Sequence, residues 1–391
     1  MIPFEEALDI IKSHAQPRCI ERVDLFYALN RTLADDIYSD IAMPPFNKSA
    51  MDGFACRKSD IKNELQIIEE IAAGNIPTKT IGENQCARIM TGAMVPEGAD
   101  MVVMKEEIEM ITNTSLICKS PSSKSNICYL GEDVKAGELV LRKGDLLRPS
   151  QIAILASVGC DFPMVYEKPT VAIISTGNEL VEPHEIPGIS KIRNSNGYQL
   201  FAQVRQLGFS VEYLGIVSDN KESLAKVLRT TISNYRVTIL SGGVSVGDYD
   251  FVPEVLNQLN VNIKIHGIDI RPGKHQLFGE RGYHFVFGMP GNPVSSFVQF
   301  ELLVKPFLKG LNGQTKQEPS LLLPLEEDYN CKNSNLMVFV PAIITEKSTV
   351  LPLEYHGSAH IHAYTHANAI IEIPKGFLML KKGELVRVRP L

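Results

Sequence analysis

The chain has 391 residues, a length that predicts roughly two to four domains. Its hydrophobic and charged fractions, 44% and 21%, are those of an ordinary globular protein with enough chain for sizeable cores. The formal net charge is -6 and the basic residues are dispersed, which argues against a nucleic-acid-binding protein. An anionic small molecule would therefore have to be held by local cations.

Cysteine usage and the amino terminus both favour a cytoplasmic protein. The seven cysteines are odd in number, scattered and without a C-x-x-C pair, which is typical of reduced thiols. Acidic residues stand where a secretory signal would need positive charge, and no apolar run approaches the roughly 18 residues needed to cross a bilayer. We expect a soluble, cytoplasmic protein with no membrane partner and no nucleic-acid partner.

The first third of the chain changes from helical to β-like patterning. Residues 1–43 are expected to be largely helical, because Phe4, Ala7, Leu8 and Ile11 share one helical face and a second helical stretch is predicted at Val23–Ala34. Pro44-Pro45 ends this pattern. Short apolar runs separated by turns then predict a small β domain over residues 44–126. The chain becomes helical again near Pro149–Gly159.

Strand-like runs, polar loops and helical patterns alternate from residue 169 to residue 311, which predicts a doubly wound α/β domain. Polar or glycine-containing loops follow five of the apolar runs. The runs are Val171–Ile174, Ser210–Val217, Val237–Leu240, Val261–Ile270 and His284–Phe287. Open parallel sheets bind ligands at the carboxyl ends of their strands, so the five loops predict a site along one sheet edge.

The loop after Val237–Leu240 is the most informative of the five. It contains Ser241, Gly242, Gly243, Ser245 and Gly247, followed by Asp248 and Asp250. Glycine lets backbone N–H groups approach a ligand closely, and two carboxylates at the end of such a loop suit Mg²⁺ or a donor group on a substrate. The alternative is a tight strand-to-helix turn with acidic helix caps. The spacing fits neither a Walker A loop nor a G-x-G-x-x-G fingerprint.

Residues 312–391 alternate short strands with turns and predict a second small β domain, with a helix-like patch near His360–Ala367. The pairs His356/His360 and His362/His366 have the spacing that places imidazoles on one helical face, so a transition-metal site is conceivable. Incidental exposed histidines are the favoured interpretation, because no cysteine or acid completes the set.

Several motifs, taken together and in order, are similar to those of one known family. They are PPFNKSAMDGFA (44–55), RIMTGAMVPEGADMVVMKE (88–106), NICYLGEDVKAGE (126–138), STGNEL (175–180), SGGVSVGDYDF (241–251), RPGK (271–274), GMPGNPVS (288–295) and HGSAHIHAYTHANAIIEIPKG (356–376). The chain resembles the MoeA family of molybdopterin molybdenumtransferases, which includes the E domain of gephyrin.

The resemblance implies a fold of four parts. A discontinuous helical linker domain, residues 1–43 and 127–168, is interrupted by the β insert at 44–126. A molybdopterin-binding-like α/β domain at 169–311 and a β-barrel-like domain at 312–391 follow. The family also implies an elongated homodimer, and the adenylyltransferase of the preceding biosynthetic step is a further expected partner.

The activity implied by the resemblance is the insertion of molybdate into adenylylated molybdopterin, with release of AMP. A divalent cation, expected to be Mg²⁺, would neutralise charge on the leaving phosphate. The functional positions of the family correspond here to Asp52, Thr91, Asp133, Glu179, Asp219 and Asp250, with Asp219 and Asp250 as the expected metal ligands. The expected substrate-binding residues are Ser241, Gly242, Gly243, Ser245, Gly247, Arg271, Lys274, Pro290, Gly291, Asn292 and Pro293.

Three of these acids also have structural roles as alternatives. Asp219 could cap the helix that begins near Lys221, Asp133 could be an ordinary turn residue, and Asp52-Gly53 alone is only a turn signal.

The sequence departs from the family pattern at positions that usually carry positive charge. Gly267 replaces a common lysine, His275 follows Pro-Gly-Lys, Cys128-Tyr129-Leu130 replaces an arginine-containing segment, and Pro341 stands where an arginine is usual. Together these changes remove cations from the expected anion path.

Two other functions compete with the transferase. The adenylyltransferase of the preceding step shares the α/β domain but resembles a single short domain. A non-catalytic scaffold that binds pterin or a partner peptide is the alternative from another class. Retention of Glu179, Asp219 and Asp250 argues against pure scaffolding.

Overall fold

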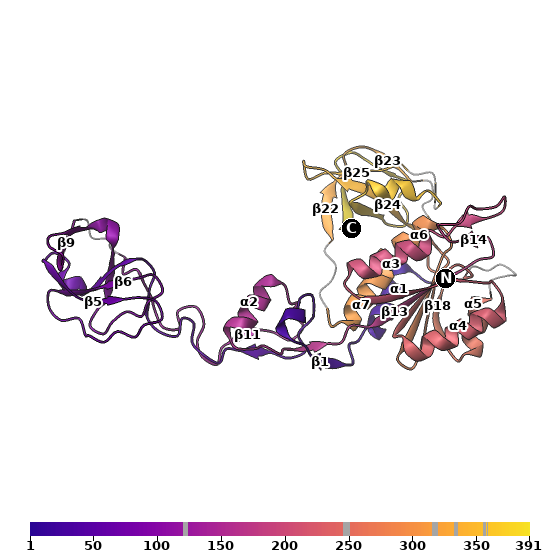
Figure 1. Ribbon diagram of the computed structural model, residues 1–391. Helices are drawn as coiled ribbons and strands as arrows, with labels where there is room; N and C mark the ends of the chain where they lie inside the picture. Colours follow the sequence, from indigo (N-terminus) through magenta and orange to yellow (C-terminus); the bar gives the residue numbers. More distant parts are fainter. Residues whose placement is uncertain (120–123, 245–250, 315–319, 332–334, 355–356, 358) are drawn as a thin grey trace.

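The computed structural model describes residues 1–119, 124–244, 251–314, 320–331, 335–354, 357 and 359–391. The molecule is elongated, with a β insert at one end, a narrow linker, and a large α/β unit that lies beside a carboxyl-terminal β unit (Figure 1). The predicted multidomain class, α/β plus β, is confirmed. None of the helices in the described ranges has the length and apolar character needed to span a membrane.

The α/β unit is built on a six-stranded sheet with the order β16-β13-β17-β21-β20-β18. Its strands are β13 (Thr170–Thr176), β16 (Ser210–Val217), β17 (Val237–Ser241), β18 (Asn262–His266), β20 (Leu277–Arg281) and β21 (His284–Met289). The first four strands of that order are parallel, and β20 is antiparallel to both of its neighbours. Every residue of β17 and β21 is buried, because helices cover both faces.

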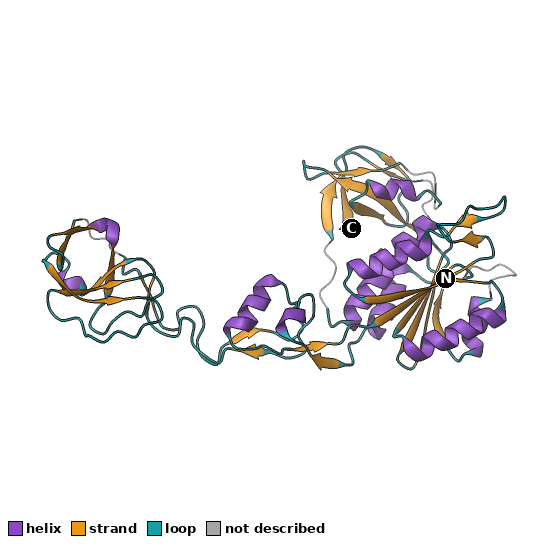
Figure 2. Ribbon diagram, viewed as in Figure 1, coloured by secondary structure: helices purple, strands orange, loops and turns teal. Residues whose placement is uncertain are grey.

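The helices divide between the two faces of this sheet (Figure 2). One face carries α1 (Phe4–His14), α3 (Asn196–Gln206), α6 (Pro293–Gln299), the π-helical turn η4 (Phe300–Val304) and α7 (Lys305–Leu311). The other carries α4 (Lys221–Asn234) and α5 (Val252–Gln258). Alternation along β13 supplies both cores, since Ile173 packs on the α1 face and Ile174 on the α4 face.

The position of α1 corrects the predicted linker, which included residues 1–43. Phe4, Ala7 and Ile11 are buried in the same core as β17 and β21, and the Phe4 ring packs edge-on against Phe339 of the carboxyl-terminal unit at 5.2 Å. The apolar stripe of an amphipathic helix needs a large partner surface, which the sheet offers and the thin linker does not.

The linker itself is less helical than predicted. It contains the strand pairs β1 (Ile20–Arg22) with β12 (Met164–Tyr166), β2 (Ile37–Tyr38) with β11 (Leu139–Leu141), and β3 (Lys48–Ser49) with β10 (Ile127–Cys128), together with α2 (Pro149–Ser157) and the 3-10 turn η1 (Leu25–Tyr27). The predicted helix at Val23–Ala34 is wrong beyond η1. Asn30 and Leu33 donate backbone hydrogen bonds to Leu147 and Asp145, so pairing with a distant segment replaces local helix formation.

The insert forms a second six-stranded sheet with the order β7-β4-β6-β5-β9-β8. Its elements are β4 (Gly53–Cys56), η2 (Lys58–Asp60), β5 (Leu65–Ile71), β6 (Gln85–Ile89), β7 (Met101–Met104), η3 (Lys105–Glu107), β8 (Ile108–Met110) and β9 (Ser115–Cys118). Met101 and Val103 face one small core and Val102 faces another, which is the alternation predicted for strands of this length.

The carboxyl-terminal unit has a sheet with the order β19-β24-β26-β28-β22, and β25 pairs with β24. Its elements are β22 (Leu321–Pro324), β23 (Tyr329–Asn330), β24 (Met337–Ile344), β25 (Val350–Pro352), the 3-10 turn η5 (Ile361–Thr365), β26 (Ala369–Ile373), β27 (Met379–Leu380) and β28 (Leu385–Pro390). The edge strand β19 (Ile270–Arg271) comes from the α/β part of the chain and pairs with Met337 and Val338.

The predicted strand Val261–Ile270 is therefore two strands in two different sheets. Gly267 separates β18 from β19 and has φ +96°, a conformation that glycine adopts without strain. The RPGK motif consequently begins at the boundary between the α/β unit and the carboxyl-terminal unit.

The placement of α1 generates a testable prediction. Ile11→Ala removes a fully buried side chain from the sheet core and should lower the stability of the α/β unit by about 2–5 kcal/mol. Hydrogen exchange followed by mass spectrometry should show faster exchange in β17 and β21 but not in β4 and β6 of the insert. Asp9→Ala, at an exposed position of the same helix, is the matched control. Unchanged protection of β17 and β21 in Ile11→Ala would disprove this role of α1.

Candidate active site

The parallel strands of the α/β unit end together at one sheet edge. In the strand register, Thr176 pairs with Val217, and Ser241 pairs with both Ser175 and Met289. The loops that begin at Gly177, Ser218, Gly242 and Pro290 therefore start side by side. This shared edge is the location that the sequence predicted for the site.

The glycine loop after β17 depends on the absence of side chains. Gly242 has φ +97°, and a Cβ there would lie 2.3 Å from the Thr176 carbonyl oxygen. The Gly242 N–H donates to the Met289 carbonyl at 3.0 Å, so this amide holds two loops together and is already engaged. Gly243 also has positive φ, at +67°. The predicted residues Ser245, Gly247 and Asp250 lie outside the described residues.

Asp219 lies beside this loop, half-buried. Its Oδ1 accepts a hydrogen bond from the Thr176 hydroxyl at 3.3 Å, and its backbone N–H donates to Asn178 Oδ1 at 3.2 Å. A Cβ on Gly243 would be 3.8 Å from the same Oδ1. The alternative that Asp219 caps the next helix is wrong, because the N-cap of α4 is Asn220, which accepts from the Ser223 N–H at 2.9 Å.

Glu179 is exposed in the turn after β13, between that strand and the short pair β14 (Leu180–Val181) and β15 (Ile192–Arg193). Its carboxylate folds back on its own turn, since a Cβ built on Gly177 would be 2.6 Å from Glu179 Oε2. The strand order places this turn next to the Asp219 loop, because β13 and β16 are neighbours.

Asn196, at the start of α3, connects two loops of the site and was missed by the sequence analysis. Its Nδ2 donates to Ser241 Oγ at 2.9 Å and to the Gly291 carbonyl at 2.8 Å. The side chain is buried, and its Oδ1 has no hydrogen-bond partner within the described part of the chain. Asn196 thus fixes the spacing between the loop after β17 and the loop after β21. A polar Asn-Ser-Asn run just before a helix is the signal that could have indicated it.

A cleft of about 700 Å³ extends from this edge to the carboxyl-terminal unit. Its lining includes four of the predicted binding residues, Arg271, Lys274, Pro290 and Asn292. Gly273 allows the RPGK turn to approach α6, because a Cβ there would be 2.7 Å from Gln299 Nε2, which donates to the Gly273 carbonyl. Pro293 begins α6, and Gly291 is exposed beside it.

Three acidic residues that were not predicted also line the cleft. They are Glu327, Asp328 and Glu354 of the carboxyl-terminal unit. Asp328 accepts from the Lys382 N–H at 2.8 Å and is paired with Lys381 at 3.1 Å. These contacts, the Lys382 N–H first, lower the pKa of Asp328, so this carboxylate is ionised and its charge is compensated locally.

Local structure is consistent with the loss of two of the expected cations. Gly267 has φ +96°, a conformation that disfavours lysine, and a Cβ there would lie 2.8 Å from Met1 Cγ. Pro341 is buried inside β24, where a charged side chain would be desolvated. Positive charge in the cleft therefore comes from the exposed side chains of Arg271 and Lys274, with His275 beside them.

Asp52 and Thr91 come together in the insert. Asp52 Oδ1 accepts hydrogen bonds from the Thr91 N–H at 2.8 Å and from the Thr91 hydroxyl at 2.7 Å, and Lys105 Nζ lies 3.9 Å from Oδ2. The Thr91 N–H contributes most to lowering the pKa of Asp52, which is therefore a carboxylate at neutral pH. Asp133 is exposed near the insert, with its backbone N–H bonded to the Met43 carbonyl at 3.1 Å.

The linker separates these insert residues from the sheet edge within one chain (Figure 1). Asp52 and Thr91 belong to the insert, whereas Glu179, Asp219, Arg271 and Lys274 belong to the α/β unit. The predicted site residues thus form two groups on separate bodies.

The histidine-rich segment offers no metal cluster in the described structure. His360, His362 and His366 are exposed, and η5 is a 3-10 turn, in which residues four apart do not share a face. His356 lies outside the described residues. Across the ranges that are described, no group of three or more His, Cys, Asp or Glu side chains is arranged to hold a metal ion.

Three family descriptions match consecutive parts of the chain. The MoeA N-terminal region (domain I and II) matches residues 2–159, the probable molybdopterin binding domain matches 172–310, and the MoeA C-terminal region (domain IV) matches 330–391.

Named relatives match along nearly the full length. A Staphylococcus epidermidis protein named molybdopterin molybdenumtransferase is 37% identical over 398 residues, covering 99% of this chain and 95% of that protein. A Staphylococcus aureus protein of the same name is 34% identical with the same coverage.

Solved structures agree with these relatives. A molybdopterin biosynthesis moeA protein from Pyrococcus horikoshii OT3 superposes with a TM-score of 0.85 at 29% identity over all of both chains. A second moeA structure from the same species gives a TM-score of 0.83 at 32% identity, covering 100% of this chain and 99% of that one. Since family regions, relatives and structures all match in order along the chain, it belongs to the MoeA family.

Proposed function

We propose that this chain inserts molybdate into adenylylated molybdopterin, with cleavage of the phosphoanhydride and release of AMP. The observation that carries the proposal is the joining of two features at one sheet edge. The half-buried carboxylate of Asp219 lies beside the glycines of the loop after β17. A cleft whose lining includes Arg271 and Lys274 opens from the same edge. Family membership identifies which reaction such an edge would serve.

The two features suit different parts of the reactants. Arg271 and Lys274 offer charge-assisted contacts to a small oxyanion, and the guanidinium can bind it through two parallel hydrogen bonds. Positive-φ glycines expose backbone at the loop after β17, where a phosphate can approach closely. Asn196 would hold that loop at a fixed distance from the loop of Gly291, so that both ends of one substrate are positioned together.

The described part of the edge fits a hard divalent cation. Asp219 and the Thr176 hydroxyl present oxygen atoms of the kind that Mg²⁺ prefers. Asp219, together with Asp250, would hold the ion, and the bound ion would neutralise charge on the phosphates as AMP leaves.

The first prediction from this proposed function concerns Asp219. Asp219→Ala should reduce single-turnover AMP release from adenylylated molybdopterin at least about 100-fold, because it removes a carboxylate that faces the glycine loop. Asp219→Asn should also slow AMP release, because it removes the negative charge of the carboxylate. Glu222→Ala is the control, since Glu222 is an exposed acid in the first turn of the adjacent helix.

Thermal melting and pterin binding should be measured on the same samples. AMP release at the wild-type rate in folded Asp219→Ala would refute the assigned role. Binding of adenylylated molybdopterin by the wild type without any AMP release would instead favour a scaffold.

The second prediction concerns Lys274. Lys274→Ala should weaken molybdate binding by about 1–3 kcal/mol, because the charge-assisted contact between the Lys274 ammonium group and the anion in the cleft is lost. Calorimetric titration with molybdate measures the change, and Lys226→Ala, an exposed lysine of α4, is the control. Equal affinities in wild type and Lys274→Ala would show that Lys274 is only a solvated surface charge.

We further propose that the chain acts in the cytoplasm as a homodimer with composite sites. The linker exposes large apolar side chains, of which Phe26 is 93% and Tyr27 78% exposed, with Ile20, Leu29 and Phe162 also exposed. Such a surface suits a second copy of the chain. A two-fold arrangement could bring the Asp52–Thr91 pair of one subunit to the sheet edge of the other. The adenylyltransferase of the preceding step is a further proposed partner.

Mixed dimers give the third prediction. Homodimers of Asp52→Ala or Asp219→Ala should be nearly inactive, whereas an isolated dimer of one Asp52→Ala chain and one Asp219→Ala chain should have roughly half of the wild-type activity. One of its two sites would contain both defects and the other none. Differential affinity tags isolate the mixed dimer for measurement of AMP release.

A reciprocal pairing makes the test sharper. A dimer of one wild-type chain and one Asp52→Ala/Asp219→Ala chain places one defect in each composite site and should be inactive. If each site lay within one chain, this dimer would have half activity and the first mixed dimer none. That reversed pattern would rule out composite sites while leaving the chemistry of the sheet edge intact.

A further inference from the structure

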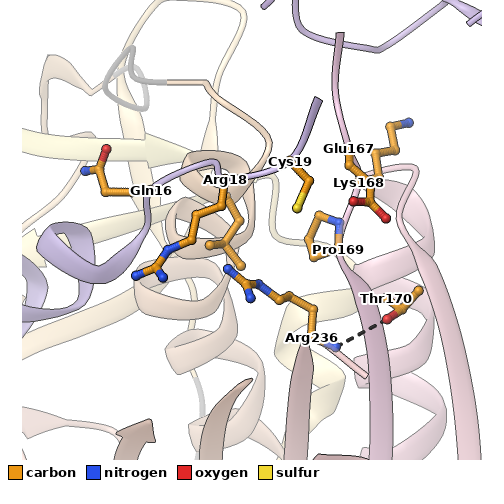
Figure 3. A pocket seen from close by; sticks show the side chains of 9 residues that line it. Gln16, Arg18, Cys19, Glu167, Lys168, Pro169, Thr170 and Arg236 are labelled. Atoms are coloured by element: carbon orange, nitrogen blue, oxygen red, sulfur yellow. Dashed lines mark hydrogen bonds between the residues drawn. The ribbon is translucent and has the colours of Figure 1, made fainter. Parts of the chain in front are cut away.

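A small basic pocket lies at the opposite edge of the α/β sheet, where the parallel strands begin. We call it the basal pocket (Figure 3). It has a volume of about 100 Å³, and its lining includes Arg18, Cys19, Glu167, Lys168, Thr170 and Arg236. Thr170 is the first residue of β13, and Arg236 directly precedes β17. The strand register therefore separates the basal pocket from the proposed active site by the length of the sheet.

Positive charge is concentrated in the basal pocket although the whole chain carries a net charge of -6. Arg18, Lys168 and Arg236 line it together with a single acid, Glu167. Lys168 Nζ donates to the Gly208 carbonyl at 2.9 Å. Neither Arg18 nor Arg236 forms a salt bridge with any carboxylate in the part of the chain that the structure describes.

The two guanidinium groups share one aromatic neighbour. Both lie over the ring of Tyr283, with Arg18 Cζ 4.2 Å and Arg236 Cζ 5.1 Å from its centroid. Figure 3 shows both side chains ending on the same side of the pocket. The Arg236 N–H is anchored to the Thr170 carbonyl at 3.0 Å and to the Thr170 hydroxyl at 3.2 Å, so the backbone that carries this charge is fixed.

Like charges in this arrangement repel each other. Burial, and then the charge of Arg18, lowers the pKa of Arg236, which is half-buried. An anion between the guanidinium groups would remove this repulsion and accept hydrogen bonds from both planar forks.

We propose that the basal pocket binds a small tetrahedral oxyanion, inorganic phosphate or molybdate, between Arg18 and Arg236. The basal pocket is large enough for such an ion, because its volume of about 100 Å³ is several times the roughly 10–15 Å³ that one water molecule needs. The oxygens of a tetrahedral anion offer each guanidinium a pair of acceptor atoms for its two parallel N–H groups, whereas a chloride ion is a single acceptor atom.

The position of the basal pocket gives the bound ion a structural consequence. The Glu167 N–H donates to the Cys19 carbonyl at 3.0 Å, and Ile20 pairs with Tyr166 in the first strand pair of the linker. An ion between Arg18 and Arg236 would therefore connect the sheet to the segment where the linker leaves the α/β unit. The proposal does not depend on the proposed transferase reaction.

Calorimetric titration of the full chain tests the proposal in a buffer free of phosphate and sulfate. Inorganic phosphate and molybdate are each titrated into the Lys274→Ala variant, in which anion binding to the cleft at the other sheet edge is expected to be weaker. Arg18→Ala and Arg236→Ala should each weaken binding about 10-fold or more, and Arg236→Lys should restore only part of it. Arg229→Ala, an exposed arginine on α4, should leave it unchanged.

Anomalous diffraction from crystals soaked in molybdate locates the ion directly and should give a peak between Arg18 and Arg236. The proposal is overturned if neither ion binds at millimolar concentration, if the Arg18 and Arg236 variants bind normally, or if Arg229→Ala weakens binding equally. Should Arg236→Ala fail to fold, the exposed Arg18 decides the matter. Competition between the two ions identifies the one that binds more tightly. AMP release by Asp219→Ala is measured separately, so failure of the transferase proposal and failure of this one can be distinguished.

Discussion

The register of the parallel strands is the constraint on which the proposed chemistry depends. The strands β13, β16, β17 and β21 end within one residue of one another in the register, at Thr176, Val217, Ser241 and Met289. Four loops that are distant in sequence therefore begin beside one another. The site therefore needs few direct side-chain contacts to assemble. Gly242 and Asn196 then set the spacing between these loops. The Gly242 N–H donates a hydrogen bond to the Met289 carbonyl, and Asn196 donates to both Ser241 and the Gly291 carbonyl.

The second constraint is the thin linker between two bodies. Strand pairs such as β1 with β12 carry the chain outward and back, so the insert has its own cores and its own ionised carboxylate, Asp52. Within one chain the linker lies between the insert and the α/β unit (Figure 1). The composite sites proposed above would require two copies of the chain, and the exposed aromatic side chains of the linker support that proposal.

The lining of the cleft carries charges of both signs. Arg271 and Lys274 share it with Glu327, Asp328 and Glu354, and Lys381 compensates Asp328. An oxyanion would therefore be drawn to the two cations and repelled by the carboxylates, which favours a defined position over high affinity. The basal pocket, in contrast, is predominantly basic, since two guanidinium groups share it with one acid.

The sequence by itself determined the α/β alternation, the strands of the insert and the loops at one sheet edge, because these depend on local hydrophobic period and glycine content. It also indicated Asp219, Arg271 and Lys274 through the family resemblance. Only the tertiary structure decided what depends on distant partners. It placed α1 on the sheet because Ile11 needs a large apolar surface, and it divided Val261–Ile270 between two sheets at Gly267. It also revealed Asn196 and the Arg18–Arg236 pair, whose neighbours are far away in sequence.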